Sequence, residues 1–397
     1  MSEIDALIFG GGAAGLWLLD ELHRRGFSTL LIERDALGSG QTIASQGIIH
    51  GGIKYALTGL GTSAARGVRN MPGVWRNCLA GRTEPNLART AVLAERCFLW
   101  RTGSVSSRLG LVGARLGLSS HVEHVAIPDR PPLLRECPGD VYSVNEQVID
   151  VGSFLEDLSQ RHQSRIIRVE NADLIRFAAA RTGRTTVVLA GALPGETEHE
   201  LQPDYVILSA GAGNEVLRQR TGLPCDAMQR RPLHMVLARG ELPEIFGHCI
   251  DGAKTRVTIT TTTDSSGTRV WQVGGQVAED GVKRGSEELV EHAQRELRSA
   301  LPGVNLDDVE WATYRVDRAE ERMPGGKRPK GWTVRQEGNV LTVWPTKLAL
   351  VPELARDVAD RLGKPRVGHL ELGPLCPDWP HPEVALPPWD TEHRWQS

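Results

Sequence analysis

Apolar and polar positions at the start of the chain fall in blocks that predict a strand, a helix and a second strand. Residues 4–9 form a short, mostly apolar run, as a buried parallel strand does. Leucines at helical spacing follow within residues 16–22, and Gly26 is placed to end that helix. Residues 28–32 form a second apolar run, and Glu33 stands at its end. The pattern predicts a βαβ unit in a parallel sheet.

The same patterns predict elements across the rest of the chain. Two β-branched runs flank residues 264–267, whose Asp-Ser-Ser-Gly sequence is typical of a turn, so they predict a hairpin. Residues 286–301 carry apolar side chains at helical spacing, which predicts an amphipathic helix. Further elements are a helix opened by Asp150, two strands within 165–190 around a polar turn at 181–184, strands at 205–213, 229–239 and 311–316, and a last helix through Leu354, Val358 and Leu362 that ends before Gly363.

Composition narrows the class of protein without naming a function. A chain of 397 residues is too long for one ordinary core and suggests two packed domains. Charged residues make up 24%, and the net charge of -3 offers no basic field for nucleic acid. We find no apolar run of about 18 residues that would predict a transmembrane helix, and we expect no signal peptide. The scattered cysteines include no Cys-x-x-Cys pair, which argues against a metal site and fits a reducing cytoplasm.

The turn between the first strand and its helix carries the pattern Gly-x-Gly-x-x-Gly at Gly10, Gly12 and Gly15. The first glycine permits a tight turn, the second lets the backbone approach a pyrophosphate, and the third lets helix and strand pack closely. The helix N-terminus favours an anion because of its N–H groups and its dipole. Glu33 stands where a carboxylate accepts hydrogen bonds from a ribose, which argues against NADP. The unit predicts a dinucleotide site and leaves FAD and NAD both open. We also expect the dinucleotide to contact Ala13, Ala14 and Arg34.

The next segment separates the two cofactors. Small and hydroxyl-bearing residues accumulate in 38–55, where an NAD dehydrogenase usually proceeds to an ordinary helix. This stretch resembles the D-amino-acid-oxidase-like (DAO) superfamily of FAD-dependent oxidoreductases, and within it the FAD-dependent glycerol-3-phosphate dehydrogenases and then the L-2-hydroxyglutarate oxidases. The matching residues are Thr42, Ser45, Ile49-His50-Gly51-Gly52 and Tyr55. Lys54 stands where the dehydrogenase pattern has arginine, which keeps the charge and loses the bidentate fork.

The resemblance implies a fold class of α/β plus α+β, in which a Rossmann-like FAD-binding domain is interleaved with an antiparallel-sheet substrate domain. It assigns residues 1–80, 145–225 and 335–365 to the FAD-binding domain, residues 81–144 and 226–334 to the substrate domain, and residues 366–397 to an irregular tail. Residues 205–213 resemble a second fingerprint of the superfamily that closes over the FAD. The residues that the resemblance adds to the expected FAD site are Thr42, Ser45, Gln46, Gly47, His50, Gly51, Ala172, Ala210, Gly211, Thr346, Lys347 and Leu348.

Five residues are expected to take part in catalysis, on the substrate or on the flavin. His234 takes the place of a strand histidine that faces the substrate in the dehydrogenases, and an imidazole is a suitable base near neutral pH. Arg315 lies where a family arginine clamps the substrate's anionic group through a fixed fork. Lys347, ahead of a helix N-terminus, is placed to stabilise negative charge on the flavin. Lys54 and Tyr55 add to the anion pocket.

These residues predict a flavin dehydrogenase or oxidase that removes a hydride from a small anionic hydroxy compound, such as a 2-hydroxy acid or a glycerol phosphate. One alternative is an amine or amino-acid oxidase of the same superfamily, because an anion pocket and a base serve both reactions. A second alternative is a partner-dependent or non-catalytic FAD-binding subunit. The electron acceptor is open among oxygen, a quinone and a carrier protein. The expected location is the cytoplasm, with docking at a membrane surface as a route to quinone.

Overall fold

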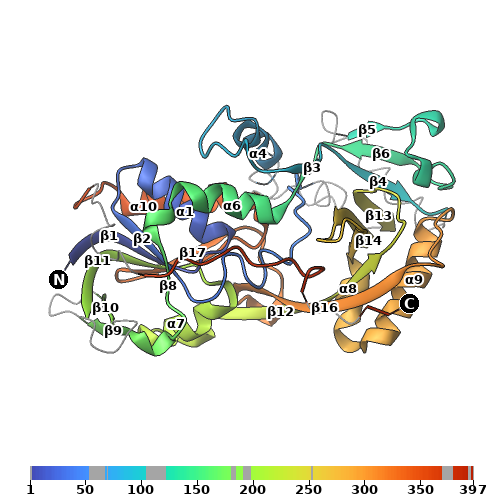
Figure 1. Ribbon diagram of the computed structural model, residues 1–397. Helices are drawn as coiled ribbons and strands as arrows, with labels where there is room; N and C mark the ends of the chain where they lie inside the picture. The colour runs from blue at the N-terminus through green and yellow to red at the C-terminus, as the bar shows by residue number, and fades with distance from the viewer. Residues whose placement is uncertain are drawn as a thin grey trace.

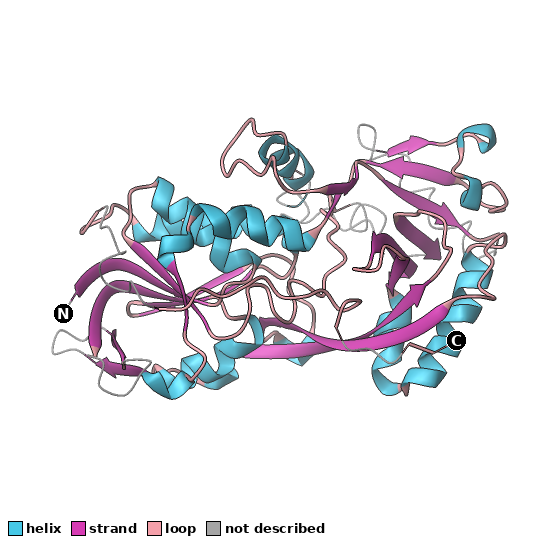
Figure 2. Cartoon of the chain, viewed as in Figure 1, coloured by secondary structure: helices cyan, strands magenta, loops and turns pink. Residues whose placement is uncertain are grey.

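The structure is a computed structural model that describes residues 2–52, 68, 70–103, 122–179, 185–190, 198–251, 254–368, 379–391 and 395–396. Two eight-stranded sheets form the two ends of an elongated molecule, and helices pack on each of them (Figures 1 and 2). A short ladder joins β3 (Val92–Ala94) to β7 (Val148–Ile149). No helix in these described ranges is long and apolar enough to cross a membrane.

The first sheet has the predicted βαβ unit at its centre. β1 (Ser2–Phe9) pairs in parallel with β2 (Thr29–Glu33) on one side and with β11 (His199–Leu208) on the other. A parallel strand that is covered on both faces is expected to be apolar, and residues 4–9 are buried throughout. The strand order is β17-β18-β11-β1-β2-β8, and β10 pairs with β11 and with β9. The remaining strands are β8 (Ile166–Arg168), β9 (Ile175–Ala179), β10 (Thr185–Leu189), β17 (Thr333–Glu337) and β18 (Val340–Trp344).

Helices cover both faces of this sheet. One face carries α1 (Ala13–Arg24), α4 (Met71–Leu79), α6 (Val151–Arg161) and α10 (Val351–Leu362), and the other face carries α7 (Asn214–Arg220). Three aromatic side chains, Trp17, Trp75 and Phe154, contact one another where α1, α4 and α6 meet. Their burial fixes the position of α1, and with it the N-terminus that faces the glycine turn.

The second sheet is antiparallel except for the pair β13–β4, in the order β16-β12-β15-β14-β13-β4-β6-β5. Helix α9 (Ser286–Ala300) packs on one face of this sheet through its Leu289 and Leu297 side chains. The short helix α8 (Gln276–Asp280) lies nearby. The opposite face carries Met235 and Tyr314, and these pack against Ala44 of the first domain. The strands are β4 (Cys97–Arg101), β5 (Val122–His124), β6 (Val141–Val144), β12 (Met228–Arg239), β13 (Gly247–Asp251), β14 (Lys254–Thr263), β15 (Arg269–Gly274) and β16 (Glu310–Glu321).

Most of the predicted elements are confirmed. β14 and β15 form the expected hairpin, α9 spans the expected amphipathic helix, and Asp150 caps α6 by accepting the Ser153 N–H at 2.7 Å. Residues 165–190 hold three strands rather than two, because β8 joins β2 in parallel while β9 and β10 form a separate hairpin. The predicted turn at 181–184 lies outside the described residues. The 3-10 helices are η2 (Ile127–Asp129), η3 (Pro132–Leu134), η4 (Gln163–Arg165), η5 (Ala172–Leu174), η6 (Gly211–Gly213), η7 (Cys225–Ala227), η8 (Gly281–Lys283), η9 (Pro324–Gly326) and η10 (Leu348–Leu350).

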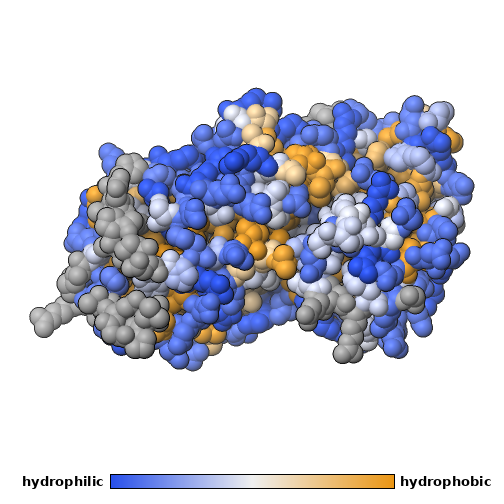
Figure 3. All heavy atoms as spheres, viewed as in Figure 1, coloured by the Kyte–Doolittle hydropathy of each residue, from blue (hydrophilic) through white to orange (hydrophobic). Residues whose placement is uncertain are grey.

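The described part of the C-terminal tail runs from one sheet to the other. On the first domain, the Leu37 N–H donates to the Glu383 carbonyl at 2.7 Å, and the Ala385 N–H donates back to Leu37 at 3.0 Å. On the second, Trp311 and Gln396 exchange backbone hydrogen bonds of 2.6 and 2.8 Å. The face shown in Figure 3 is mainly hydrophilic, with apolar side chains gathered near the middle of the molecule. The tail therefore ties the two halves together without forming a helix in its described part.

Candidate functional site

The turn between β1 and α1 brings the predicted glycines against neighbouring backbone. Gly10 has a φ of 104°, and a Cβ placed on it would lie 2.5 Å from the Cα of Ala210. A Cβ on Gly15 would lie 1.9 Å from the Gly10 carbonyl oxygen. Gly12 is less crowded, since a Cβ there would meet only the Thr42 hydroxyl, at 3.0 Å. Gly10 and Gly15 therefore permit the tight turn, and Gly12 leaves room at the N-terminus of α1.

The carboxylate of Glu33 lies against the same turn. Its Oε2 accepts a hydrogen bond from the Gly11 N–H at 2.6 Å. Its Oε1 accepts the backbone N–H groups of Arg34 and Asp35, at 2.8 and 3.0 Å. The end of β2 thus holds an ordered carboxylate beside the glycines, where the sequence places the ribose partner.

Two other predicted cofactor contacts make an ion pair or a hydrogen bond within the protein, one through its side chain and the other through its backbone. The Arg34 side chain is exposed and pairs with Asp35. Ala172 lies on η5, where its carbonyl accepts a hydrogen bond from an arginine of α7 at 2.5 Å. Shortly before Ala172 in the sequence, Val169 donates its N–H to the Glu33 carbonyl at 2.8 Å, after the strand pairing of Glu33 with Arg168.

The second predicted fingerprint meets the first one. The Ser209 hydroxyl, just after β11, donates to the Gly10 carbonyl at 3.0 Å. The Ala210 N–H donates to the Asn214 side chain at 2.8 Å, and Gly211 begins η6 with a φ of 55°. These contacts hold the end of β11 against the glycine turn, so the two fingerprints form one structure.

Residues 42–47 connect the glycine turn to the second sheet. The Thr42 hydroxyl accepts the Ala13 N–H at 3.3 Å, at the first turn of α1. The Ser45 hydroxyl is buried and has no hydrogen-bond partner within the described part of the chain. Gly47 has a φ of 65°, and a Cβ there would lie 2.1 Å from a backbone carbonyl. A buried hydroxyl without a partner is unfavourable, so Ser45 is suited to bond a ligand.

The side chain of Gln46 turns toward the second sheet. Its side-chain amide donates to the carbonyl groups of Gln272 and Thr258, at 2.8 and 3.3 Å. The carbonyl of Ala44 accepts one hydrogen bond from the Gln272 amide and one from the Tyr314 hydroxyl, each at 2.9 Å. The segment is thus fastened to the face of the sheet opposite α9.

These features together fit a bound dinucleotide. Glycines allow close backbone approach, Glu33 supplies a carboxylate, and the Ser45 hydroxyl is buried without a partner in the described residues. The residue that precedes α1 is Gly12, which has no side chain to cap the helix, and the first turn contains no acidic residue. The N–H groups at the start of α1 therefore suit a pyrophosphate.

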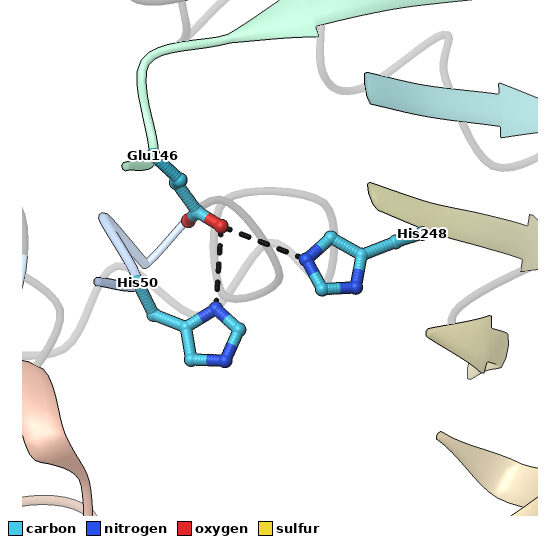
Figure 4. A group of neighbouring side chains, drawn as sticks. All are labelled: His50, Glu146 and His248. Carbon is cyan, nitrogen blue, oxygen red and sulfur yellow. Dashed lines mark hydrogen bonds and ion pairs between the residues drawn. The ribbon is translucent and has the colours of Figure 1, made fainter. Parts of the chain in front are cut away.

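Farther along the same segment, His50 meets Glu146 and His248 (Figure 4). The three residues come from the segment after Gly47, from the loop between β6 and β7, and from β13. His50 Nδ1 lies 3.2 Å from Glu146 Oε2, and His248 Nε2 lies 3.7 Å from the same oxygen. The other oxygen, Oε1, accepts the Gly51 N–H at 2.6 Å. One buried carboxylate therefore faces two imidazoles and a backbone N–H.

The charges of this cluster shift its pKa values. Burial alone would raise the pKa of Glu146, but the charge and hydrogen bond of His50, together with the nearby His248 ring, outweigh burial and hold that pKa well below its usual range. Burial lowers the pKa of Lys347 to about 7, nearby Arg328 acts in the same direction, and Glu146 opposes them. The site therefore combines a stable carboxylate with a lysine that titrates near neutral pH.

Lys347 is held by the turn that precedes it. Thr346 has a φ of 59°, and its hydroxyl donates to the Gly331 carbonyl at 2.8 Å. No other non-glycine residue in the described ranges has a positive φ, and such strained positions are often found at functional sites. Leu348 begins η10, which leads into α10. Lys54 and Tyr55 lie outside the described residues.

The structure corrects the predicted roles of His234 and Arg315. These residues are direct neighbours across β12 and β16. His234 Nδ1 lies 3.1 Å from the Gly281 carbonyl, and Arg315 donates to two carbonyl groups of the η8 region at 3.0 and 2.9 Å. Tyr314, one residue away on β16, points to the opposite face and contacts Ala44. His234 and Arg315 therefore face away from the FAD segment, because alternate residues of a strand point to opposite faces.

A mixed sheet whose parallel centre carries this glycine turn, together with a largely antiparallel second sheet, is typical of flavin oxidoreductases. The family model of FAD-dependent oxidoreductases, the DAO family, matches residues 5–341, and the chain belongs to this family. Its cofactor is FAD, as the segment after Glu33 predicted. The predicted fold class and the predicted family are both confirmed.

Known proteins with similar sequences match either nearly the whole chain or a short part of it. The probable FAD-dependent oxidoreductase PA4991 of Pseudomonas aeruginosa is 40% identical over 391 residues, which cover 97% of each chain. Its crystal structure superimposes with a TM-score of 0.80 and 35% identity, covering 98% of this chain and 97% of that one. Mitochondrial glycerol-3-phosphate dehydrogenase of Bos taurus is 44% identical over 54 residues, 14% of this chain and 7% of that one. Glycine oxidase from Geobacillus kaustophilus shares the fold, with a TM-score of 0.67, 16% identity and coverage of 94% and 98%.

The sequence analysis missed Glu146 and His248. Neither lies in a recognised motif, and Glu146 is 96 positions from His50. One signal was present: His248 stands in a strand whose other side chains are mainly apolar, so it had to be buried with a polar partner.

Proposed function

We propose that this FAD-dependent oxidoreductase oxidises a small anionic hydroxy compound, and that His50 accepts the hydroxyl proton. When bound, FAD supplies the acceptor for the hydride that leaves the substrate carbon. The observation that carries the proposal is the contact of His50 Nδ1 with the buried carboxylate of Glu146, at 3.2 Å. This carboxylate fixes the orientation of the ring and directs Nε2 away from Glu146 (Figure 4).

A base of this kind favours a hydroxyl substrate over an amine. An alcohol holds its proton tightly, so oxidation to a carbonyl requires a group that takes this proton as the hydride leaves. An amine can lose its extra proton to water before the reaction and then needs no base at that step. An imidazole backed by an ionised carboxylate becomes a stronger base, because the carboxylate stabilises the imidazolium that forms.

The neighbouring charges suit an anionic substrate. Lys347 lies close enough to Glu146 and Arg328 for its pKa to depend on both. An anion bound next to Lys347 would favour its protonated form, so that binding and protonation strengthen each other. Lys347 is therefore proposed to attract the carboxylate or phosphate of the substrate, together with Arg328.

The first test is anaerobic reduction of the bound flavin by a panel of 2-hydroxy acids, glycerol phosphates and amino acids, followed by visible absorbance. The proposal expects bleaching by at least one anionic hydroxy compound. Bleaching by amino acids alone would show that the protein is an amine oxidase. Failure of every compound, with dithionite still bleaching the flavin, would favour a subunit that depends on a partner.

The second test is His50→Leu. The rate of flavin reduction should fall by about 10²–10⁴-fold, the usual contribution of a positioned base. The matched control is His124→Leu, because His124 is exposed on β5. Flavin content is measured in both variants, so that a loss of base is distinguished from a loss of FAD. If the flavin is reduced at an unchanged rate in His50→Leu that is fully loaded with FAD, His50 is not the base.

A further inference from the structure

Three side chains around Glu146 direct metal-ligating atoms at one small volume. A ring nitrogen of His50, a ring nitrogen of His248 and a carboxylate oxygen of Glu146 all lie within 4.8 Å of one another (Figure 4). His50 Nδ1 is 3.2 Å and His248 Nε2 is 3.7 Å from Glu146 Oε2. Two ligands of a tetrahedral zinc ion lie about 3.3 Å apart, because each bond is about 2.0–2.2 Å long. The three atoms therefore need only small side-chain shifts to surround such an ion.

The contacts behind these atoms hold two of the three ligands in the orientation that a metal requires. The other ring nitrogen of His248, Nδ1, lies 2.9 Å from the Thr258 hydroxyl on the neighbouring strand β14. When Nδ1 donates its hydrogen to this hydroxyl, the lone pair of Nε2 is directed at the cluster. The other oxygen of Glu146, Oε1, accepts the Gly51 N–H at 2.6 Å. Metal-binding histidines and carboxylates usually have outer partners of this kind.

The cluster is open to solvent on one side. The side chains of Glu146 and His248 are 4% and 2% exposed, whereas the side chain of His50 is 30% exposed. Solvent therefore reaches the three ligand atoms from the side of His50. A tetrahedral ion bound by three protein ligands keeps a fourth position for water or an anion, and this position would lie on the open side.

The ligands and the surrounding charges select the kind of ion. Imidazole suits zinc, copper, iron and nickel, whereas Mg²⁺ and Ca²⁺ prefer oxygen ligands. Two histidines and one glutamate are the protein ligands of a known type of zinc site. Lys347 lies close enough to Glu146 and Arg328 to sense the charges of both. These two basic side chains oppose a cation that is attracted by charge alone, so binding depends on direct bonds to the imidazole nitrogens.

We propose that His50, Glu146 and His248 form a binding site for one divalent metal ion that prefers nitrogen ligands, such as Zn²⁺, and that occupancy of this site inhibits the enzyme. With a metal on Nδ1, the ring hydrogen of His50 is on Nε2, which then has no lone pair to accept the proton of the substrate. The metal site is independent of the proposed function, whereas the inhibition rests on His50 as the base. The scattered cysteines argued against a metal site, but this cluster contains no cysteine.

The first test is equilibrium dialysis of the FAD-loaded enzyme against Zn²⁺, with bound metal and flavin both measured. We expect one zinc per chain, and X-ray absorption of the bound zinc should show two imidazole ligands. In His248→Leu the Kd for zinc should rise by more than about 100-fold, since the loss of an outer partner alone costs about 10–100-fold. His234→Leu is the matched control, because His234 is also a buried strand histidine and contacts Gly281 instead of Glu146. It should bind zinc as the wild type does.

Thr258→Val is a milder variant that keeps all three ligands, and it serves if His248→Leu does not fold or does not retain FAD. It removes the hydroxyl behind Nδ1 of His248 and keeps the shape of the side chain, so the Kd for zinc should rise by about 10–100-fold. The absence of stoichiometric zinc in the wild type would overturn the metal site. A Kd that stays unchanged in both variants would also overturn it, because the zinc would then be bound elsewhere.

The second test measures anaerobic flavin reduction with and without Zn²⁺, using the compound that bleaches the flavin. The rate should fall in proportion to the fraction of chains that hold zinc, and excess EDTA should restore it. In His248→Leu, the zinc concentration that saturates the wild type should no longer change the rate. If zinc slows both proteins equally, the inhibition does not come from this cluster. If zinc occupies the cluster without slowing reduction, the metal site stands and the base role of His50 fails.

Discussion

The Tyr314 hydroxyl donates a hydrogen bond to the backbone carbonyl of Ala44 at 2.9 Å. Tyr314 lies on β16 of the second sheet, and Ala44 lies in the segment that follows the glycine turn. The Gln272 amide donates to the same carbonyl, also at 2.9 Å. Two side chains of the second sheet thus hold the segment next to Ser45, and the position of the candidate cofactor site depends on a sheet from the other half of the chain.

Replacing Tyr314 with Phe tests this dependence. Tyr314→Phe keeps the ring and removes two buried hydrogen bonds, the one donated to Ala44 and the one accepted from Gln272, so the free energy of unfolding should fall by about 1–3 kcal/mol. The Kd for FAD should rise, because the Ala44 segment is less firmly held. Denaturant unfolding and fluorescence titration with FAD measure the two effects. Tyr142→Phe is the control, since its hydroxyl makes no hydrogen bond within the described residues. Equal values for both variants would mean that the contact does not position the segment.

Ser45→Ala distinguishes a ligand-binding hydroxyl from a structural one. In the protein without FAD, the substitution removes a buried hydroxyl that has no partner among the described residues, so stability should be unchanged or higher. FAD binding should weaken by about 1 kcal/mol, the value of one hydrogen bond. Thr29→Val is a matched control, because the Thr29 hydroxyl on β2 is likewise buried without a described partner. If Ser45→Ala and Thr29→Val bind FAD equally well, Ser45 does not contact the cofactor.

The glycine turn should not tolerate a side chain at its first position. Gly10→Ala places a Cβ 2.5 Å from Ala210 and forces a φ of 104° on a residue that disfavours it. Backbone strain of this kind costs about 1–3 kcal/mol, and overpacking adds about 1–3 kcal/mol. Gly40→Ala separates the two effects, because Gly40 has a φ of 82° and nothing within 4 Å of an added Cβ. Thermal unfolding and flavin content should show a much larger loss for Gly10→Ala. If Gly10→Ala and Gly40→Ala lose similar amounts of stability and flavin, backbone strain at the positive φ accounts for the whole effect of Gly10→Ala.

Lys347 should make stability depend on pH in the alkaline range. Its folded pKa of about 7 lies below the ordinary lysine value of 10.5, so the unfolded chain binds more protons between these values. The free energy of unfolding should therefore rise with pH from about 7 to about 10, by no more than about 1.4 kcal/mol per unit. Lys347→Met should abolish this rise in FAD-free protein, and Lys364→Met, at an exposed position after α10, should keep it. Urea midpoints at several pH values provide the measurement. If the free energy of unfolding still rises with pH in Lys347→Met, another titrating group causes the rise.

Local patterns predicted the first sheet and its glycine turn well. Strand, turn and helix are set by neighbours in sequence, so the spacing of Gly10, Gly12 and Gly15 with Glu33 was sufficient. The second fingerprint was found for the same reason. Its contact between Ala210 and Gly10, about half the chain apart, follows from the parallel pairing of β1 and β11.

The faces of the second sheet could not be predicted in this way. Alternation along residues 229–239 sets His234 on one face and Met235 on the other, but it does not say which face α9 covers. That choice depends on packing between distant segments, and it places His234 beside η8 rather than on the face that contacts Ala44. The cluster of His50, Glu146 and His248 was out of reach for the same reason, because three unrelated segments supply its members.

The contact between Gly10 and Ala210 has a consequence for how the protein is made. The ribosome releases β1 and α1 early, but β11, which pairs with β1 and brings Ala210 to the turn, is synthesised about half a chain later. β18 and the tail, which complete the sheet and tie it to the second half, follow near the end of translation. Contacts this distant in sequence form slowly, and a partly built sheet exposes apolar surface while it waits. We therefore expect FAD to bind only after β11 has been synthesised and has brought Ala210 against the glycine turn.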